Sequence, residues 1–161
     1  MIRTGIGYDV HPFAANRRLV LGGVEFAFDR GLLGHSDADV LLHAIADALL
    51  GAAAQGDIGR HFPPADPAFR DADSLDLLAS AGAIVRAAGF TVVNIDATVI
   101  AEEPKIGPKA AEMVGNIARA LEISQSSVNI KATTNEGLGF IGRAEGIAAL
   151  AIATVSGEII E

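Results

Sequence analysis

Strand-like and helix-like segments alternate along this 161-residue chain, and that alternation limits the possible folds more than any other feature of the sequence. Strand-like segments lie at residues 2–11, 126–134 and 147–160, and residues 90–108 begin as a strand and continue as a connection that contains Pro and Gly. A short hairpin lies at 17–26 around Gly22 and Gly23, and helix-like segments lie at 37–54, 73–89 and 108–122. We therefore expect an α/β (α+β) fold, a single domain over residues 1–161 in which helices cover one face of a mixed β-sheet.

Glycine and proline mark further features along these segments. Gly5 and Gly7 fall inside the first strand-like segment, where they predict the close approach of another backbone or a bulge. Residues 56–73 are dense in Gly, Pro and Asp and indicate a long loop, and loops of that length are usually functional or disordered.

The composition excludes several classes of protein. The chain has no cysteine, which rules out disulfides, thiolate chemistry and Cys-ligated metal sites. Its 20 acidic and 12 basic residues give a net charge of −8, which argues against a nucleic-acid partner because such binding needs a basic face. There is neither a run of about 18 apolar residues nor the start of a secretory signal, so we expect a cytoplasmic protein with no membrane segment.

Asp9 and His11 are separated by one residue in the first strand-like segment. Successive strand side chains point to opposite faces, so Asp9 and His11 share one face and Val10 takes the other. His43, in the first helix-like segment, adds a third ligand, and such a set with a fourth position open is how catalytic zinc is usually held. Asp47 follows His43 by one helical turn and would accept its remaining ring N–H. The alternative is a structural His43 paired with Asp47 alone.

Other polar residues gather at the expected ends of elements. His35 and Ser36 come just before the first helix, where their donors would face a bound ligand; the alternative is that Ser36 or Asp37 simply caps the helix. Thr133, Thr134 and Glu136 follow a strand-like segment. Their oxygens suit phosphate contacts and a hard cation such as Mg²⁺, although a Thr pair is also ordinary in a strand.

Five stretches occur in an order and spacing that resemble the 2-C-methyl-D-erythritol 2,4-cyclodiphosphate synthase family. They are DVH at residues 9–11, HSDADVLLHAIADALLGAAAQGDIG at 35–59, FPPADPAF at 62–69, EEPKIGP at 102–108 and TTNEGLGFIGR at 133–143. The resemblance covers essentially the whole chain. It implies an enzyme of the non-mevalonate route to isoprenoids, in its single-function form, that assembles as a homotrimer with active sites between subunits.

The resemblance also implies roles for individual residues. The three candidate ligands would bind zinc, Glu136 would hold a second divalent cation, Mg²⁺ or Mn²⁺, and His35 and Thr134 would be the catalytic residues that stabilise the transition state. Residues 57–59 would contact the methylerythritol part, and residues 101–107 with Thr133 the cytidine diphosphate part. The substrate-binding residues that it implies are Asp9, Val10, His11, His35, Ser36, Asp57, Ile58, Gly59, Phe62, Asp66, Ala101, Glu102, Glu103, Pro104, Lys105, Ile106, Gly107, Thr133, Thr134, Asn135, Glu136, Phe140 and Arg143.

The implied reaction is an intramolecular phosphoryl transfer. The 2-phosphate oxygen of 4-diphosphocytidyl-2-C-methyl-D-erythritol 2-phosphate would attack the β-phosphorus, CMP would leave, and 2-C-methyl-D-erythritol 2,4-cyclodiphosphate would form. Two other functions stay open: a zinc-dependent hydrolase of phosphoesters, and a trimeric binding protein in which zinc is structural.

Three positions depart from the family pattern. Ala38 replaces a common glycine, Pro64 replaces an acidic residue that often follows "FP" and leaves Asp66 as the acid of that loop, and Asn135 ends the Thr run. These departures bear on contacts with the substrate and leave the metal ligands unchanged.

A cavity on the trimer axis is a further implication of the resemblance. Phe140, Arg143 and Glu145 match residues that line it. Arg143 would either bind the diphosphate of a prenyl diphosphate, with apolar side chains around the tail, or pair with Glu145.

Overall fold

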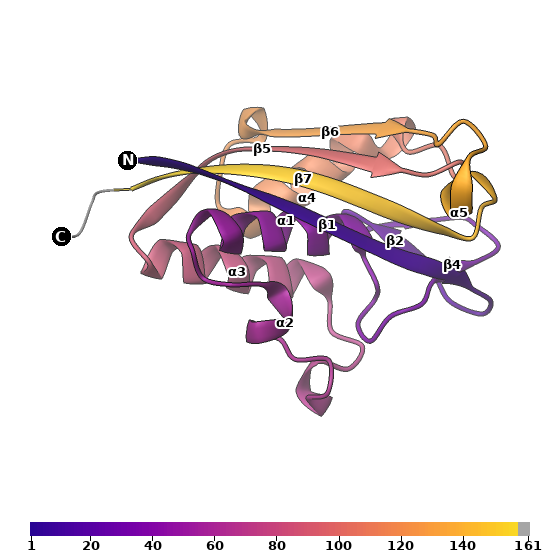
Figure 1. Ribbon diagram of the computed structural model, residues 1–161, viewed down its shortest axis with the longest axis horizontal. Coiled ribbons are helices and arrows are strands. Elements are labelled where there is room, and N and C mark those ends of the chain that lie inside the picture. The colour runs from indigo at the N-terminus through magenta and orange to yellow at the C-terminus, as the bar shows by residue number, and fades with distance from the viewer. Residues whose placement is uncertain (158–161) are drawn as a thin grey trace.

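The computed structural model describes residues 1–157, and a five-stranded mixed sheet forms its centre (Figure 1). In spatial order the strands are β4 (Gly31–Leu32), β1 (Ile2–Ala14), β7 (Gly146–Gly157), β5 (Phe90–Ile100) and β6 (Val128–Thr133). β5 and β6 run parallel, and the other neighbouring strands run antiparallel. The expected mixed sheet is therefore confirmed, and residues 158–160 of the expected last strand lie outside the described residues.

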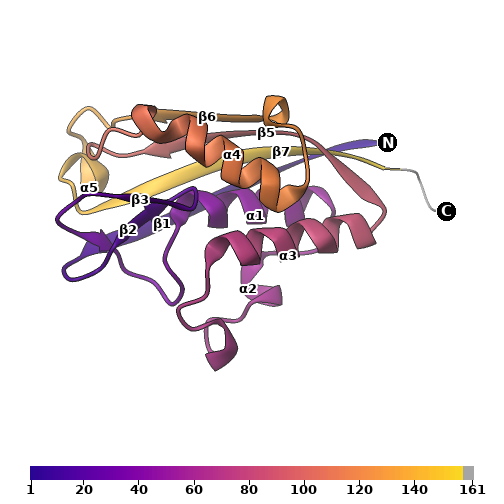
Figure 2. The same ribbon diagram turned by 180° about the vertical axis from the view of Figure 1, so that it is seen from behind.

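Three long helices cover one face of this sheet, as expected: α1 (Val40–Ala52), α3 (Ser74–Ala87) and α4 (Ala110–Leu121). Seen from behind, they stand in front of the strands (Figure 2). The expected hairpin is β2 (Leu19–Leu21) paired with β3 (Val24–Phe26). The shorter elements are α2 (Ile58–His61), α5 (Gly139–Gly142) and the 3₁₀ turns η1 (Pro67–Phe69), η2 (Gly107–Lys109) and η3 (Gln125–Ser127). Across residues 1–157, no helix has the length and apolar character needed to cross a membrane.

α1 is the most deeply buried helix because it lies between the sheet and α3, and 10 of its 13 residues are buried. Asp39 caps its N-terminus and accepts a hydrogen bond from the Leu42 amide at 3.1 Å. The same carboxylate accepts from the amides of Gly22 and Gly23 at 3.0 and 2.8 Å, which ties the β2–β3 turn to α1. Burial raises the pKa of Asp39 to about 6, although these amides act to lower it.

Gly5 and Gly7 let the backbone of α1 lie directly on β1. A Cβ at Gly7 would lie 1.9 Å from the carbonyl oxygen of Ala44, and one at Gly5 would lie 2.1 Å from that of Ala48. Of the two alternatives for these glycines, close approach is therefore correct. The register shift in the sheet lies instead in β5, between residues 92 and 94.

Residues 56–73 are more regular than the loop expected from their composition. Asp57 caps α2 by accepting from the Arg60 amide at 2.9 Å, and Asp66 caps η1 by accepting from the Ala68 amide at 2.9 Å. The segment is the expected long connection, but it contains two single turns of helix that the sequence did not predict, because such turns are too short to show a periodic apolar pattern.

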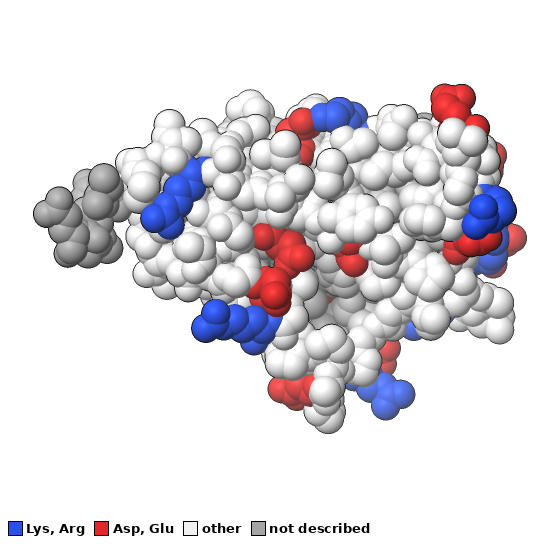
Figure 3. Space-filling model, in the orientation of Figure 1, with Lys and Arg blue, Asp and Glu red and all other residues white. Residues whose placement is uncertain are grey.

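The face of the sheet opposite the helices is uncovered and largely apolar. Ile6, Tyr8 and Val10 on β1 and Leu150 and Ile152 on β7 expose 38 to 68% of their surface. Figure 3 shows a broad uncharged area over these strands. An apolar area of this extent on a folded domain usually marks an interface.

Replacing Gly7 by alanine should destabilise the fold by about 3 kcal/mol, because the added methyl group must push α1 away from β1. Urea unfolding measures the loss. Gly51→Ala is the matched control: a Cβ there meets nothing within 4 Å, so this helical position should gain up to about 1 kcal/mol. A tolerated Gly7→Ala would contradict the close contact between the two backbones.

Candidate metal centre and active site

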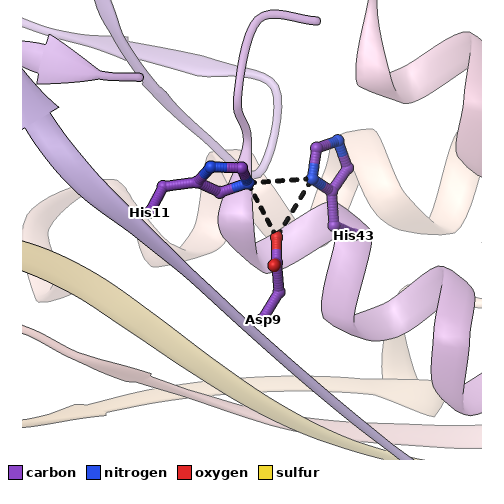
Figure 4. Close-up of side chains that lie close together, drawn as sticks. All are labelled: Asp9, His11 and His43. Carbon is purple, nitrogen blue, oxygen red and sulfur yellow. Dashed lines mark hydrogen bonds and ion pairs between the residues drawn. The ribbon is translucent and has the colours of Figure 1, made fainter. Parts of the chain in front are cut away.

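Asp9 and His11 on β1 and His43 on α1 converge on one point (Figure 4). Asp9 Oδ2 lies 2.9 Å from His11 Nε2 and 3.0 Å from His43 Nδ1, and the two nitrogens are 3.3 Å apart. All three residues are half-buried, whereas Val10 lies on the uncovered face. The prediction that Asp9 and His11 on one strand lie close to His43 on a helix is confirmed.

The outer ring nitrogen of each histidine has its own acceptor. His11 Nδ1 donates to the carbonyl oxygen of Leu33 at 2.8 Å. His43 Nε2 lies 3.0 Å from Ser74 Oγ, whose own proton goes to the Asp37 carboxylate, so His43 is the donor there. With a metal bound, these outer bonds would leave His11 Nε2 and His43 Nδ1 with lone pairs directed inward, as metal ligands require; in the metal-free protein the same two nitrogens face Asp9 Oδ2.

Asp47 does not bind His43, contrary to the expectation from their spacing. Its Oδ1 accepts from the Ile58 amide at 2.7 Å and so fixes the start of α2 against α1. Burial raises the pKa of Asp47. Ser74, at the first position of α3, takes the role that Asp47 was expected to fill. Helical spacing places two side chains on one face, but only the folded chain shows that α3 brings Ser74 nearer.

The arrangement fits a divalent metal ion. Ligands about 2.0–2.1 Å from a tetrahedral ion lie about 3.3 Å from one another, close to the three separations found here. Although burial raises it, hydrogen bonds from His11 and His43 lower the pKa of Asp9 to about 2. Although burial lowers it, the hydrogen bond and charge of Asp9 raise the pKa of His11. Within residues 1–157 no other group of three such ligands lies close enough together to hold a metal.

A cavity of about 260 Å³ opens beside the metal ligands. Of the predicted site residues, those that line it are Asp9, His11, His35, Ser36, His43, Ile58, Gly59 and Phe62. Pro64, Phe69 and Leu77 add apolar walls. One chain thus assembles the metal ligands, His35 and the segment expected to contact the methylerythritol part.

The predicted nucleotide and second-cation residues lie elsewhere. Residues 101–107 follow β5, residues 134–136 follow β6, and neither segment lines the cavity. The sheet register aligns Asp9 with Ala132 on β6 through one residue each of β7 and β5. Three strand spacings of about 4.8 Å separate these two positions by about 14 Å.

Five more predicted residues also stand outside the cavity of this chain, and one of them is Val10 on the uncovered face. Asp57 and Asp66 direct their carboxylates to helix caps. Phe140 lies on α5, and Arg143 follows it and pairs with Glu145 at 2.6 Å between Nε and Oε1. Their predicted contacts with substrate stay predictions.

Arg17, which the sequence did not mark as a site residue, holds the segment that carries His35. Arg17 Nη2 donates to the carbonyl oxygen of Ser36 at 2.8 Å, and the Asp71 amide donates to that of His35 at 3.0 Å. Two adjacent arginines in a hairpin segment look like ordinary surface residues, so no local pattern signals this contact.

The family model of the YgbB family matches residues 2–156. The chain belongs to the YgbB family. A 2-C-methyl-D-erythritol 2,4-cyclodiphosphate synthase of Bordetella petrii is 63% identical over 154 residues, which cover 96% of this chain and 95% of the relative. One of Halalkalibacterium halodurans is 56% identical over 152 residues, covering 94% and 97%. The resemblance found in the sequence is thereby confirmed.

Solved structures agree. The bifunctional IspDF of Campylobacter jejuni matches with a TM-score of 0.94 and 46% identity, over 98% of this chain and 43% of that one. A CDP complex of IspF from Plasmodium falciparum matches with a TM-score of 0.86 and 33% identity, over 98% and 97%. The fold of this YgbB family chain is therefore that of known cyclodiphosphate synthases.

Two departures from the common YgbB pattern have a structural meaning. Ala38 is fully buried and has a φ of +59°, a conformation that glycine adopts without strain and that is unfavourable for a residue with a Cβ. Pro64 lines the cavity, so this change alters the wall of the site itself.

The metal-free protein should lose stability as the pH rises through the pKa of His11. Because Asp9 raises that pKa, the stabilisation is fully present below pH 6.5 and disappears as the pH passes the raised value. Urea unfolding with a chelator at about pH 6 and about pH 9 measures it, and Asp9→Asn should reduce the difference. Saturating divalent metal should reverse the slope, because the metal binds only deprotonated His11. If the metal-free wild type and Asp9→Asn showed an identical pH dependence of stability, the effect of Asp9 on the pKa of His11 would be contradicted.

Proposed function

We propose that this chain converts 4-diphosphocytidyl-2-C-methyl-D-erythritol 2-phosphate to 2-C-methyl-D-erythritol 2,4-cyclodiphosphate and releases CMP. The set of Asp9, His11 and His43 beside a cavity carries the proposal, in a chain 63% identical to a synthase of that name. The chain would act as one domain over residues 1–161 and as a phosphorus–oxygen lyase of isoprenoid biosynthesis.

No side chain needs to act as a nucleophile in this reaction. The 2-phosphate oxygen forms a bond to the β-phosphorus while the bond from that phosphorus to the CMP oxygen breaks, and CMP leaves with the electron pair. The protein therefore has to hold the two phosphates in line and to offset their charge. Zn²⁺ on the three ligands would polarise a phosphate oxygen and neutralise part of that charge.

Residues in the cavity supply the remaining contacts of this half of the site. His35 and Ser36 lie in the cavity wall beside the metal ligands, where their donors would stabilise the crowded transition state. Ile58 and Gly59 would contact the methylerythritol part, and Phe62 adds apolar surface. The hydrogen bond from the Ile58 amide to Asp47 holds this segment in place.

The nucleotide half of the site would come from residues 101–107 and 133–136. A relative with 33% identity is described as a CDP complex, which supports a cytidine diphosphate ligand here. Lys105 and Thr133 would hold the diphosphate, Thr134 would stabilise the transition state, and Glu136 would bind Mg²⁺ or Mn²⁺, for which carboxylate oxygens are suited.

We propose a homotrimer in which each site combines two chains. Support comes from the roughly 14 Å that separates the metal half from the nucleotide half within one chain, and from the uncovered apolar face of β1 and β7. The prenyl diphosphate considered for the trimer axis would have to displace Glu145 from Arg143.

Phosphorus NMR of the protein with substrate, zinc and magnesium tests the reaction. Two coupled signals of a cyclic diphosphate should appear together with CMP. His43→Ala should bind zinc weakly and lower turnover at least about 100-fold, because a ligand and its lone pair are lost. The control His61→Ala changes a histidine outside the metal set, whose ring nitrogen bonds the Gln55 carbonyl and whose ring lies beside Phe62, and should retain both properties. Free phosphate containing solvent oxygen would instead identify a hydrolase.

Mixed trimers test the sharing of sites between chains. His43→Ala and Glu136→Ala should each be nearly inactive alone. Coexpressed, they should regain about a quarter of wild-type activity, because one site in four pairs an intact metal half with an intact nucleotide half. Sedimentation confirms the trimer. A mixture as inactive as its components would place each complete site within a single chain.

A further inference from the structure

An exposed turn after β6 holds Glu136 in an unfavourable backbone conformation. The Leu138 amide donates to the carbonyl oxygen of Asn135 at 2.9 Å and closes the turn. Its central residues, Glu136 and Gly137, have φ of +53° and +74°, as in a type I′ turn. For a residue with a Cβ, this left-handed region costs about 1–2 kcal/mol. Residues 135–140 are exposed, so the Glu136 side chain is not packed into the core, although the backbone of Gly137 lies against Gly142.

The side chain of Glu102, which lies outside the turn, stabilises it through hydrogen bonds. Its Oε1 accepts from the amides of Asn135 at 2.9 Å and Gly137 at 3.3 Å, which flank Glu136. The amide of Glu136 itself donates to Thr134 Oγ1 at 3.2 Å. Three successive amides therefore have partners, and the Glu102 carboxylate fills the place in which such a run of amides binds an anion.

The parallel pairing of β5 and β6 brings Glu102 to this place. Ile100 pairs with Thr133, and the Ala101 amide donates to the Thr133 carbonyl oxygen at 3.0 Å. The segments that follow β5 and β6 therefore leave the sheet side by side. Glu102 is the next residue. Its side chain therefore joins the segments 101–107 and 133–137.

We propose that Glu102 is a positioning residue for the cyclisation reaction. It holds the turn at residues 134–137 in one conformation, so that Thr134 and Glu136 meet the substrate with fixed geometry. This role rests on the proposed function, in which those two residues face the diphosphate. The amides of Asn135 and Gly137 donate to the same oxygen of Glu102, so a replacement side chain holds the turn only if it keeps an acceptor oxygen at that position. Glutamine keeps a carbonyl oxygen at that position, and alanine keeps none.

Turnover of three variants tests the proposal. Glu102→Ala should lower kcat about 10- to 100-fold, the range expected when a reacting group is displaced by about 1 Å, with little change in melting temperature. Glu102→Gln should stay within about threefold of wild type. Glu112→Ala, which removes an exposed carboxylate from the first turn of α4, should match wild type and controls for the lost charge.

Hydrogen–deuterium exchange of the peptide covering residues 133–139, without substrate, tests the same contact independently of chemistry. Exchange should be at least about tenfold faster in Glu102→Ala and unchanged in Glu102→Gln. If the wild type makes no cyclic diphosphate, the proposed function fails, and this exchange experiment still decides whether Glu102 holds the turn.

Two results would overturn the positioning role. One is a Glu102→Ala protein with wild-type kcat and wild-type exchange. The other is a Glu102→Gln protein that exchanges like wild type but is as slow as Glu102→Ala, because the charge of Glu102 would then act directly on the substrate or a cation.

Discussion

The direct contact between α1 and β1 determines where every ligand of the metal set lies. Gly5 and Gly7 allow the helix backbone to rest on the strand, and His43 extends from that helix toward Asp9 and His11. Metal sites tolerate errors of about 0.2 Å in ligand distance, so a helix displaced by a single methyl group would spoil the geometry. The close packing at Gly5 and Gly7 therefore determines how accurately the three candidate ligands are placed for a metal ion.

Carboxylates fix the loops around this contact. The acidic residues that accept hydrogen bonds from backbone amides are Asp37, Asp39, Asp47, Asp57, Asp66, Asp73 and Glu102. Each holds the start of a helix, a turn or a segment joining two elements. Some of the acidic residues behind the net charge of −8 therefore stabilise turns and helix starts by accepting hydrogen bonds from backbone amides.

The spacing of residues along the chain predicted which side chains share a face of a strand or helix. The alternation of Asp9, Val10 and His11 showed which two side chains share a face, whereas the cap of α1 is Asp39 and not Ser36 or Asp37 as expected. The roles of Ser74 and Arg17 depend on contacts between segments far apart in the chain, which no local pattern records. The same limit explains the wrong partner for His43, since Asp47 had the right spacing but a closer donor in Ile58.

The two histidines and the aspartate of the metal set come from a strand and a helix more than 30 residues apart in the chain, so an unfolded chain does not present them together. A metal bound here is therefore also a ligand of the folded state. At a free metal concentration 100 times the dissociation constant, such a ligand adds about 2.7 kcal/mol to the free energy of unfolding. Scarcity of metal in a cell would thus act on the lifetime of the molecule, by leaving more of it open to proteases, as well as on its rate of turnover.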